Sequence, residues 1–80
     1  MKKSFLELLE EEKRVVFDIK YFKDSAIDFL NKIETETNLE IKETHKRIAS
    51  CYEEKVIKAE ENLLQIRKEM KQYISFLETL

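Results

Sequence analysis

The chain has 80 residues, 42% apolar and 40% charged, with a net charge of −2 and neither Gly nor Pro. This length predicts one domain, residues 1–80, and the apolar content is too high for a disordered chain. The absence of Gly and Pro argues against β-hairpin turns and phosphate-binding loops. The near balance of charges argues against a nucleic-acid partner, which a basic surplus would favour.

A first helix is predicted over residues 4–34. Its apolar residues recur in alternating steps of three and four, which is the spacing of one helix face. Leu9, Val16 and Leu30 lie beside this stripe and broaden it. Glu12 and Glu36 are the two charged residues that fall on the stripe. The apolar members are Phe5, Leu8, Val15, Ile19, Phe22, Ala26, Phe29 and Ile33.

A turn is predicted over residues 35–37, where the apolar spacing fails. Thr and Asn, which disfavour helix interiors, gather between residues 35 and 38. Thr37 followed by Glu40 matches a capping box that would begin a new helix. Because neither Gly nor Pro compels a turn here, one unbroken helix is the alternative.

A second helix is predicted over residues 38–79, again from three-and-four spacing. An upstream series follows a phase displaced by one four-residue step, which predicts a stutter in the stripe. The upstream residues are Ile41, His45, Ile48 and Tyr52, and the main series is Val56, Ala59, Leu63, Ile66, Met70, Tyr73, Leu77 and Leu80.

The predicted fold class is therefore all-α, an antiparallel hairpin of two long helices. A chain this short rarely gains enough stability from one small core. We expect two hairpins to pair as a homodimeric four-helix bundle or coiled coil, because pairing would give each apolar stripe a second neighbour.

The sequence contains no catalytic constellation, and we expect no enzyme activity, cofactor, metal site or small-molecule substrate. His45 is the only histidine and falls on the apolar stripe, so it is interpreted as a partly buried spacer. Cys51 is the only cysteine, which excludes a disulfide within the chain. We interpret it as a packing residue, with a disulfide between subunits as the alternative.

Several large apolar residues lie off the stripes or near the end of the second helix, and we expect them to bind a partner. At 1.5 Å per residue, helices of about 31 and 42 residues have lengths of about 46 and 63 Å. Residues 70–80 are therefore expected to project beyond the first helix. The predicted partner-binding residues are Phe17, Tyr21, Ile57, Leu64, Met70, Tyr73, Phe76 and Leu77.

The leading functional hypothesis is a non-catalytic protein–protein interaction protein, such as a small adaptor, chaperone or regulatory inhibitor. The alternative is a small nucleic-acid-associated regulator that uses a basic strip on the second helix. Acidic residues are interleaved with this strip, which favours a solvated surface instead. No apolar run approaches the roughly 18 residues of a membrane span, so we expect a cytoplasmic protein. The strip comprises Lys42, Lys46, Arg47, Lys55 and Lys58.

Overall fold

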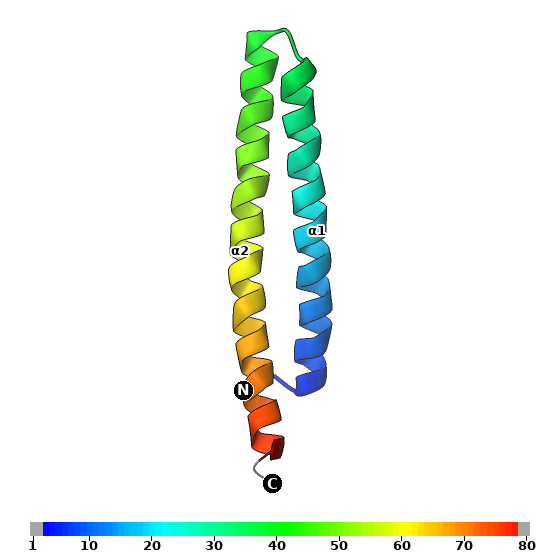
Figure 1. Cartoon of the computed structure of the whole chain (residues 1–80), viewed down its shortest axis with the longest axis vertical. Coiled ribbons are helices and arrows are strands. Elements are labelled where there is room, and N and C mark those ends of the chain that lie inside the picture. Colours follow the sequence, from blue (N-terminus) through cyan, green and yellow to red (C-terminus); the bar gives the residue numbers. More distant parts are fainter. Residues whose placement is uncertain (1–2, 79–80) are drawn as a thin grey trace.

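Two helices packed against each other make up the fold of the computed structural model. It describes residues 3–78, apart from the side chain of Leu77. Helix α1 spans Phe5–Thr35 and helix α2 spans Leu39–Glu78, and these described residues contain no strand. The helices run in opposite directions from a short turn at one end of a rod measuring 63 × 18 × 15 Å (Figure 1). The all-α hairpin predicted from the sequence is confirmed.

Helix α1 begins one residue later than predicted because Ser4 acts as its N-cap. The hydroxyl oxygen of Ser4 accepts a hydrogen bond from the backbone N–H of Glu7 at 3.2 Å. Satisfying an otherwise unpaired N–H in this way typically stabilises a helix by about 1 kcal/mol. At the other end, the hydroxyl of Thr35 donates to the carbonyl oxygens of Asn31 and Lys32.

The turn is held by two side chains that accept backbone hydrogen bonds. A carboxylate oxygen of Glu36 accepts from the N–H groups of Thr37 and Asn38, at 3.0 and 2.9 Å. The side-chain oxygen of Asn38 then accepts from Glu40 and Ile41, at 2.9 and 3.3 Å. The N-cap of α2 is therefore Asn38, and the capping box predicted at Thr37 is wrong. Asn ranks above Thr as an N-cap, and here its side-chain oxygen accepts from two N–H groups.

The two helices meet along the predicted stripe of α1. Leu8, Val15 and Ile66 form the buried centre of the contact. At the open end of the hairpin, the rings of Phe5 and Tyr73 pack edge to face with centroids 5.9 Å apart. Counting along both stripes from this pair, in steps of three and four, aligns each residue of α1 with one residue of α2. We call each aligned pair a layer, and the two residue numbers of a layer add to 78. By this count Glu36 and Lys42, both half-buried, are the last aligned pair beside the turn.

The charged residue within the stripe of α1 has a partner on α2. The side chain of Glu12 is 26% exposed, and its carboxylate accepts a hydrogen bond from Nε of Arg67 at 3.2 Å. A carboxylate can occupy this half-buried position because the guanidinium compensates for its lost hydration.

The stripe of α2 continues without the predicted stutter. Ala49 is only 2% exposed, whereas Ile41 is 44% exposed. The buried positions therefore keep one spacing from Lys42 through Ala49 to Tyr73. The small side chain of Ala49 leaves room for the ring of Phe29, which stacks on Tyr52 with centroids 6.1 Å apart.

Less of α2 projects beyond α1 than the helix lengths predict. Met70 packs against the buried centre, and the Tyr73 hydroxyl donates a hydrogen bond to the carbonyl oxygen of Lys3. The projecting segment thus starts after Tyr73 and not at residue 70, and Figure 1 shows it at the C-terminal end of α2. The difference arises because the layer beside the turn already joins residues 36 and 42, which shifts α2 along α1.

Candidate protein-binding surface

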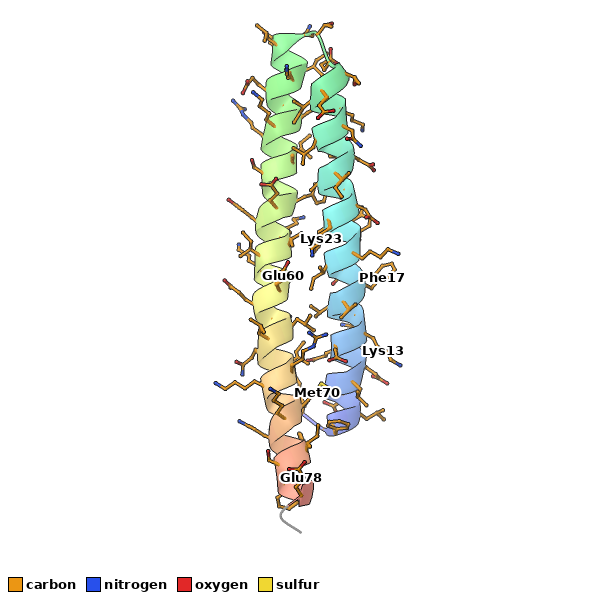
Figure 2. All side chains as sticks on the ribbon, viewed as in Figure 1. Lys13, Phe17, Lys23, Glu60, Met70 and Glu78 are labelled. Carbon is orange, nitrogen blue, oxygen red and sulfur yellow. The ribbon has the colours of Figure 1, made fainter. Side chains whose placement is uncertain are left out.

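The hairpin has two long sides, which are fixed by contacts between the helices. On one side, Nζ of Lys23 lies 3.7 Å from a carboxylate oxygen of Glu60, and Figure 2 shows the two side chains pointing toward each other. On the other side, Glu11 and Asp18 of α1 line a shallow groove together with Asn62 of α2. Residues three, four or seven positions apart share a side of a helix, so the remaining residues of α1 and α2 can be assigned to one of the two sides by their spacing from these contacts.

The side of the Lys23–Glu60 pair carries most of the exposed apolar surface, and we call it the apolar face. Of the twelve large apolar residues exposed among those described, eight lie here. Single exposed apolar residues are common on protein surfaces, but eight on one side of a small hairpin are a feature that marks a candidate contact surface. The apolar face comprises Leu6, Val16, Ile27, Leu30, Leu39, Ile57, Leu64 and Ile74, together with the half-buried Leu9.

The opposite side is mainly polar, and we call it the polar face. Its exposed large apolar residues, among those described, are Tyr21, Ile41 and Phe76. Lys3 and Glu11 form an ion pair here with a separation of 2.6 Å, and this hydrogen bond raises the pKa of the Lys3 amine. Exposed large apolar residues are therefore concentrated on one side of the hairpin.

Charged residues on the apolar face are distributed unequally between the helices. Beside the apolar residues of α1 stand three lysines and one acidic residue, Glu34, whereas α2 contributes several groups of each sign. Glu60 pairs with Lys23, and Arg67 pairs with Glu12. The α1 lysines are Lys13, Lys20 and Lys23, and the α2 charges nearest the middle of the hairpin are Glu53, Glu60 and Arg67.

The structure separates the predicted partner-binding residues into different places. Ile57 and Leu64 lie together on the apolar face, one turn to either side of Glu60. Phe17 projects from α1 on the side away from α2 (Figure 2), and Tyr21 lies on the polar face with its ring 5.8 Å from that of Phe22. These two residues are exposed but do not join the surface around Ile57.

The predicted residues near the end of α2 fall into two groups. Met70 and Tyr73 belong to the contact with α1, as described above. Phe76 is exposed beyond that contact, and the side chain of Leu77 lies outside the described residues. The sequence pattern missed Leu6, Ile27 and Leu30 as members of a common surface with Ile57. The flanking positions of an antiparallel helix pair were the signal that could have grouped them.

The basic residues of α2 do not form a strip. Lys42 is half-buried at the turn, and Lys46 pairs with Glu43 at 3.3 Å. Nζ of Lys55 lies 5.5 Å from the ring centroid of Phe22, which directs it toward the helix contact. The five positions therefore point in different directions around α2, and no phosphate-binding surface follows from them.

Residues with reactive or metal-binding potential are isolated from one another. Over residues 3–78, no three His, Cys, Asp or Glu side chains gather in a geometry that could hold a metal ion. His45 is half-buried with its ring 5.6 Å from that of Phe29, in line with the spacer interpretation. Cys51 is exposed, so its interpretation as a packing residue of the hairpin is wrong. Neither α1 nor α2, within the described range, has the run of apolar residues needed to cross a bilayer.

Comparison with known proteins adds no further constraint. No protein-family model, curated protein or solved structure matches the chain. The candidate surface therefore rests on the geometry and composition of the hairpin.

Proposed function

We propose that this chain is a non-catalytic protein–protein interaction protein that acts by helix packing through its apolar face. The observation that carries the proposal is the gathering of eight of the twelve exposed large apolar residues on one side of the hairpin. Such a surface is a characteristic of interfaces and a liability on a permanently monomeric protein.

The small core of the hairpin also supports the proposal. Among the described residues, the buried apolar side chains are Leu8, Val15, Ala26, Ala49 and Ile66. So few buried groups supply little of the free energy needed to offset the conformational entropy lost by two long ordered helices. We propose that the apolar face of a second hairpin packs on that of the first. The product is a homodimeric four-helix bundle with the two apolar faces buried between the hairpins.

The proposal is tested by measuring association of the purified chain. We expect light scattering to give twice the 9.7 kDa chain mass at micromolar concentrations. Leu64→Glu should weaken association at least tenfold, because it places a carboxylate in the centre of the apolar face. The matched control is Gln65→Glu, which introduces the same side chain one position along, on the polar face, and should change association less than twofold.

Far-UV circular dichroism should show that both variants remain helical. A wild-type chain that stays monomeric to several hundred micromolar would contradict the proposed self-association. Equal effects of the two substitutions would contradict the assignment of the binding surface to the apolar face.

A further inference from the structure

Four of the five apolar-face residues of α1 are arranged symmetrically about one position of the helix, and Val16 is the exception. Leu6 and Leu30 each lie 12 residues from position 18, and Leu9 and Ile27 each lie nine residues from it. All four are on the apolar face, which extends about 18 Å along α1 to either side of this midpoint.

The two middle residues of the apolar face on α2 define a midpoint of their own. Ile57 and Leu64 are centred between residues 60 and 61. Two charged residues of opposite sign, Glu53 and Arg67, each lie seven residues from Glu60. An apolar pair and a pair of opposite charges therefore share nearly the same centre on this helix.

The two midpoints coincide in the folded hairpin. Phe5 of α1 packs on Tyr73 of α2, and counting along both helices from this pair places position 18 of α1 level with position 60 of α2. The midpoints found separately on the two helices thus agree within one residue, or about 1.5 Å along the axis. This is the pattern that a two-fold axis at the middle of the face requires, because an isologous contact that pairs residue i with residue j of the partner also pairs j with i.

We propose that the apolar face binds a second copy of this chain head to tail, with the two turns at opposite ends of the dimer. This inference rests on the proposed function and adds the orientation of the partner. In this arrangement α1 lies on α1 of the second copy, and α2 lies on its α2. Apolar side chains then meet apolar side chains in three kinds of pair, namely Leu6 with Leu30, Leu9 with Ile27, and Ile57 with Leu64.

Charges on the face are compatible with this arrangement. Glu53 of each copy meets Arg67 of the other, which supplies two pairs of opposite charge. The like-charged meetings are Lys13 with Lys23, Glu60 with its own mate, and Glu43 with Glu78. Lys23 and Glu60 already neutralise each other within each chain at 3.7 Å, and Glu43 pairs with Lys46 at 3.3 Å, which weakens these repulsions. Val16 meets the long stem of Lys20, which covers apolar surface while its amine stays in water.

The opposite orientation, with both turns at the same end, matches the apolar residues less well. In that arrangement α1 would lie on α2 of the second copy at equal height. Ile27 and Leu30 would then lie level with Ser50 and Lys46, and Ile57 level with Lys20. By the same rule Leu6 would lie near Ile74 and Val16 near Leu64, so only four residues of the apolar face would meet an apolar residue. In the head-to-tail dimer six of the nine do so, while Val16, Leu39 and Ile74 do not, and more apolar surface is removed from water. A standard interface needs about 800 Å² from each partner, which is about an eighth of the 6653 Å² surface of the hairpin.

Disulfide trapping distinguishes the two orientations. In a Cys51→Ser background, Glu60→Cys places a thiol at the proposed axis, where it meets its own mate. Lys46→Cys places a thiol on the same face and helix, but 14 residues from the axis. In the head-to-tail dimer its mate is about 42 Å away along the rod, whereas a disulfide requires Cα atoms within about 7 Å. With both turns at one end, the two positions would behave alike.

We expect dimers in both variants by light scattering, and oxidation should cross-link at least ten times more of the Glu60→Cys variant than of the Lys46→Cys variant. Dimers that cross-link equally at the two positions, at neither, or only at residue 46 would overturn the orientation but leave the proposed self-association standing. A chain that is monomeric by light scattering would overturn both.

Discussion

Replacement of Ile66 by alanine tests the packing between α1 and α2. Ile66 is 4% exposed and contacts Leu8 and Val15 at the centre of the hairpin. Removing a buried isoleucine side chain beyond Cβ typically costs about 2–5 kcal/mol, through lost apolar burial and the cavity that remains. Because a two-helix core is shallow and can partly collapse onto the gap, we expect a loss near the lower end, about 2–3 kcal/mol.

The matched control is Ile41→Ala, which makes the same chemical change on the same helix. Ile41 is 44% exposed, so less apolar burial is lost and no closed cavity forms. The higher helix propensity of alanine offsets part of that loss, by about 0.4 kcal/mol. We expect a net change below about 1 kcal/mol.

Both variants should be compared with the parent chain by urea unfolding, followed by circular dichroism at 222 nm. All samples need the same protein concentration, because self-association makes stability depend on concentration. If Ile66→Ala does not fold in water, Ile66→Val should still fold with a loss of about 0.5–1.5 kcal/mol. Equal losses at residues 66 and 41, or no loss at residue 66, would refute the assignment of the buried stripe on α2.

Two further substitutions test the turn and the charged position inside the stripe. Asn38→Ala should cost about 1 kcal/mol in urea unfolding because two N–H groups of α2 lose their acceptor, whereas Thr37→Ala should cost less than half of that. A larger loss of stability for Thr37→Ala than for Asn38→Ala would show that Thr37, the residue predicted from the sequence, is the N-cap. A double-mutant cycle with Glu12→Gln and Arg67→Met should give a coupling of about 0.5–1 kcal/mol that falls in 1 M NaCl, since the Arg67 side chain is half exposed. A coupling indistinguishable from zero at low salt would mean that this pair does not stabilise the hairpin.

The stripe of α1 could be predicted from the sequence because its three-and-four spacing is unbroken from Phe5 to Glu36. The upstream part of α2 could not be, because Ile48 is a stronger apolar signal than its neighbour Ala49. In the structure, the small residue occupies the buried position, since the adjacent layers are filled by aromatic rings. Hydrophobicity alone does not report how much room a layer offers.

The candidate surface was predicted in part for a similar reason. Spacing identified Ile57 and Leu64 as apolar residues outside the stripe, but it did not say which side of the folded hairpin they would occupy. That side is defined by the contact between Lys23 and Glu60, which joins residues far apart in sequence. The shift of α2 along α1 likewise depends on how Glu36 and Asn38 close the turn. The lengths of the two helices carry no information about that closure.

The layered contact also implies an order in which the hairpin closes. The layer beside the turn aligns Glu36 with Lys42, which are only six residues apart in sequence. The layer of Phe5 and Tyr73 instead brings together residues that are 68 positions apart, which closes a long loop. The entropic cost of forming the distant layer directly is larger, since every doubling of loop length adds about 0.6 kcal/mol. Once one layer has formed, however, the next adds a loop of only about seven residues. Folding by this route proceeds from the turn toward the open end, and the segment around Phe5 and Tyr73 joins last and opens first, so its amide hydrogens exchange with solvent sooner than those beside the turn.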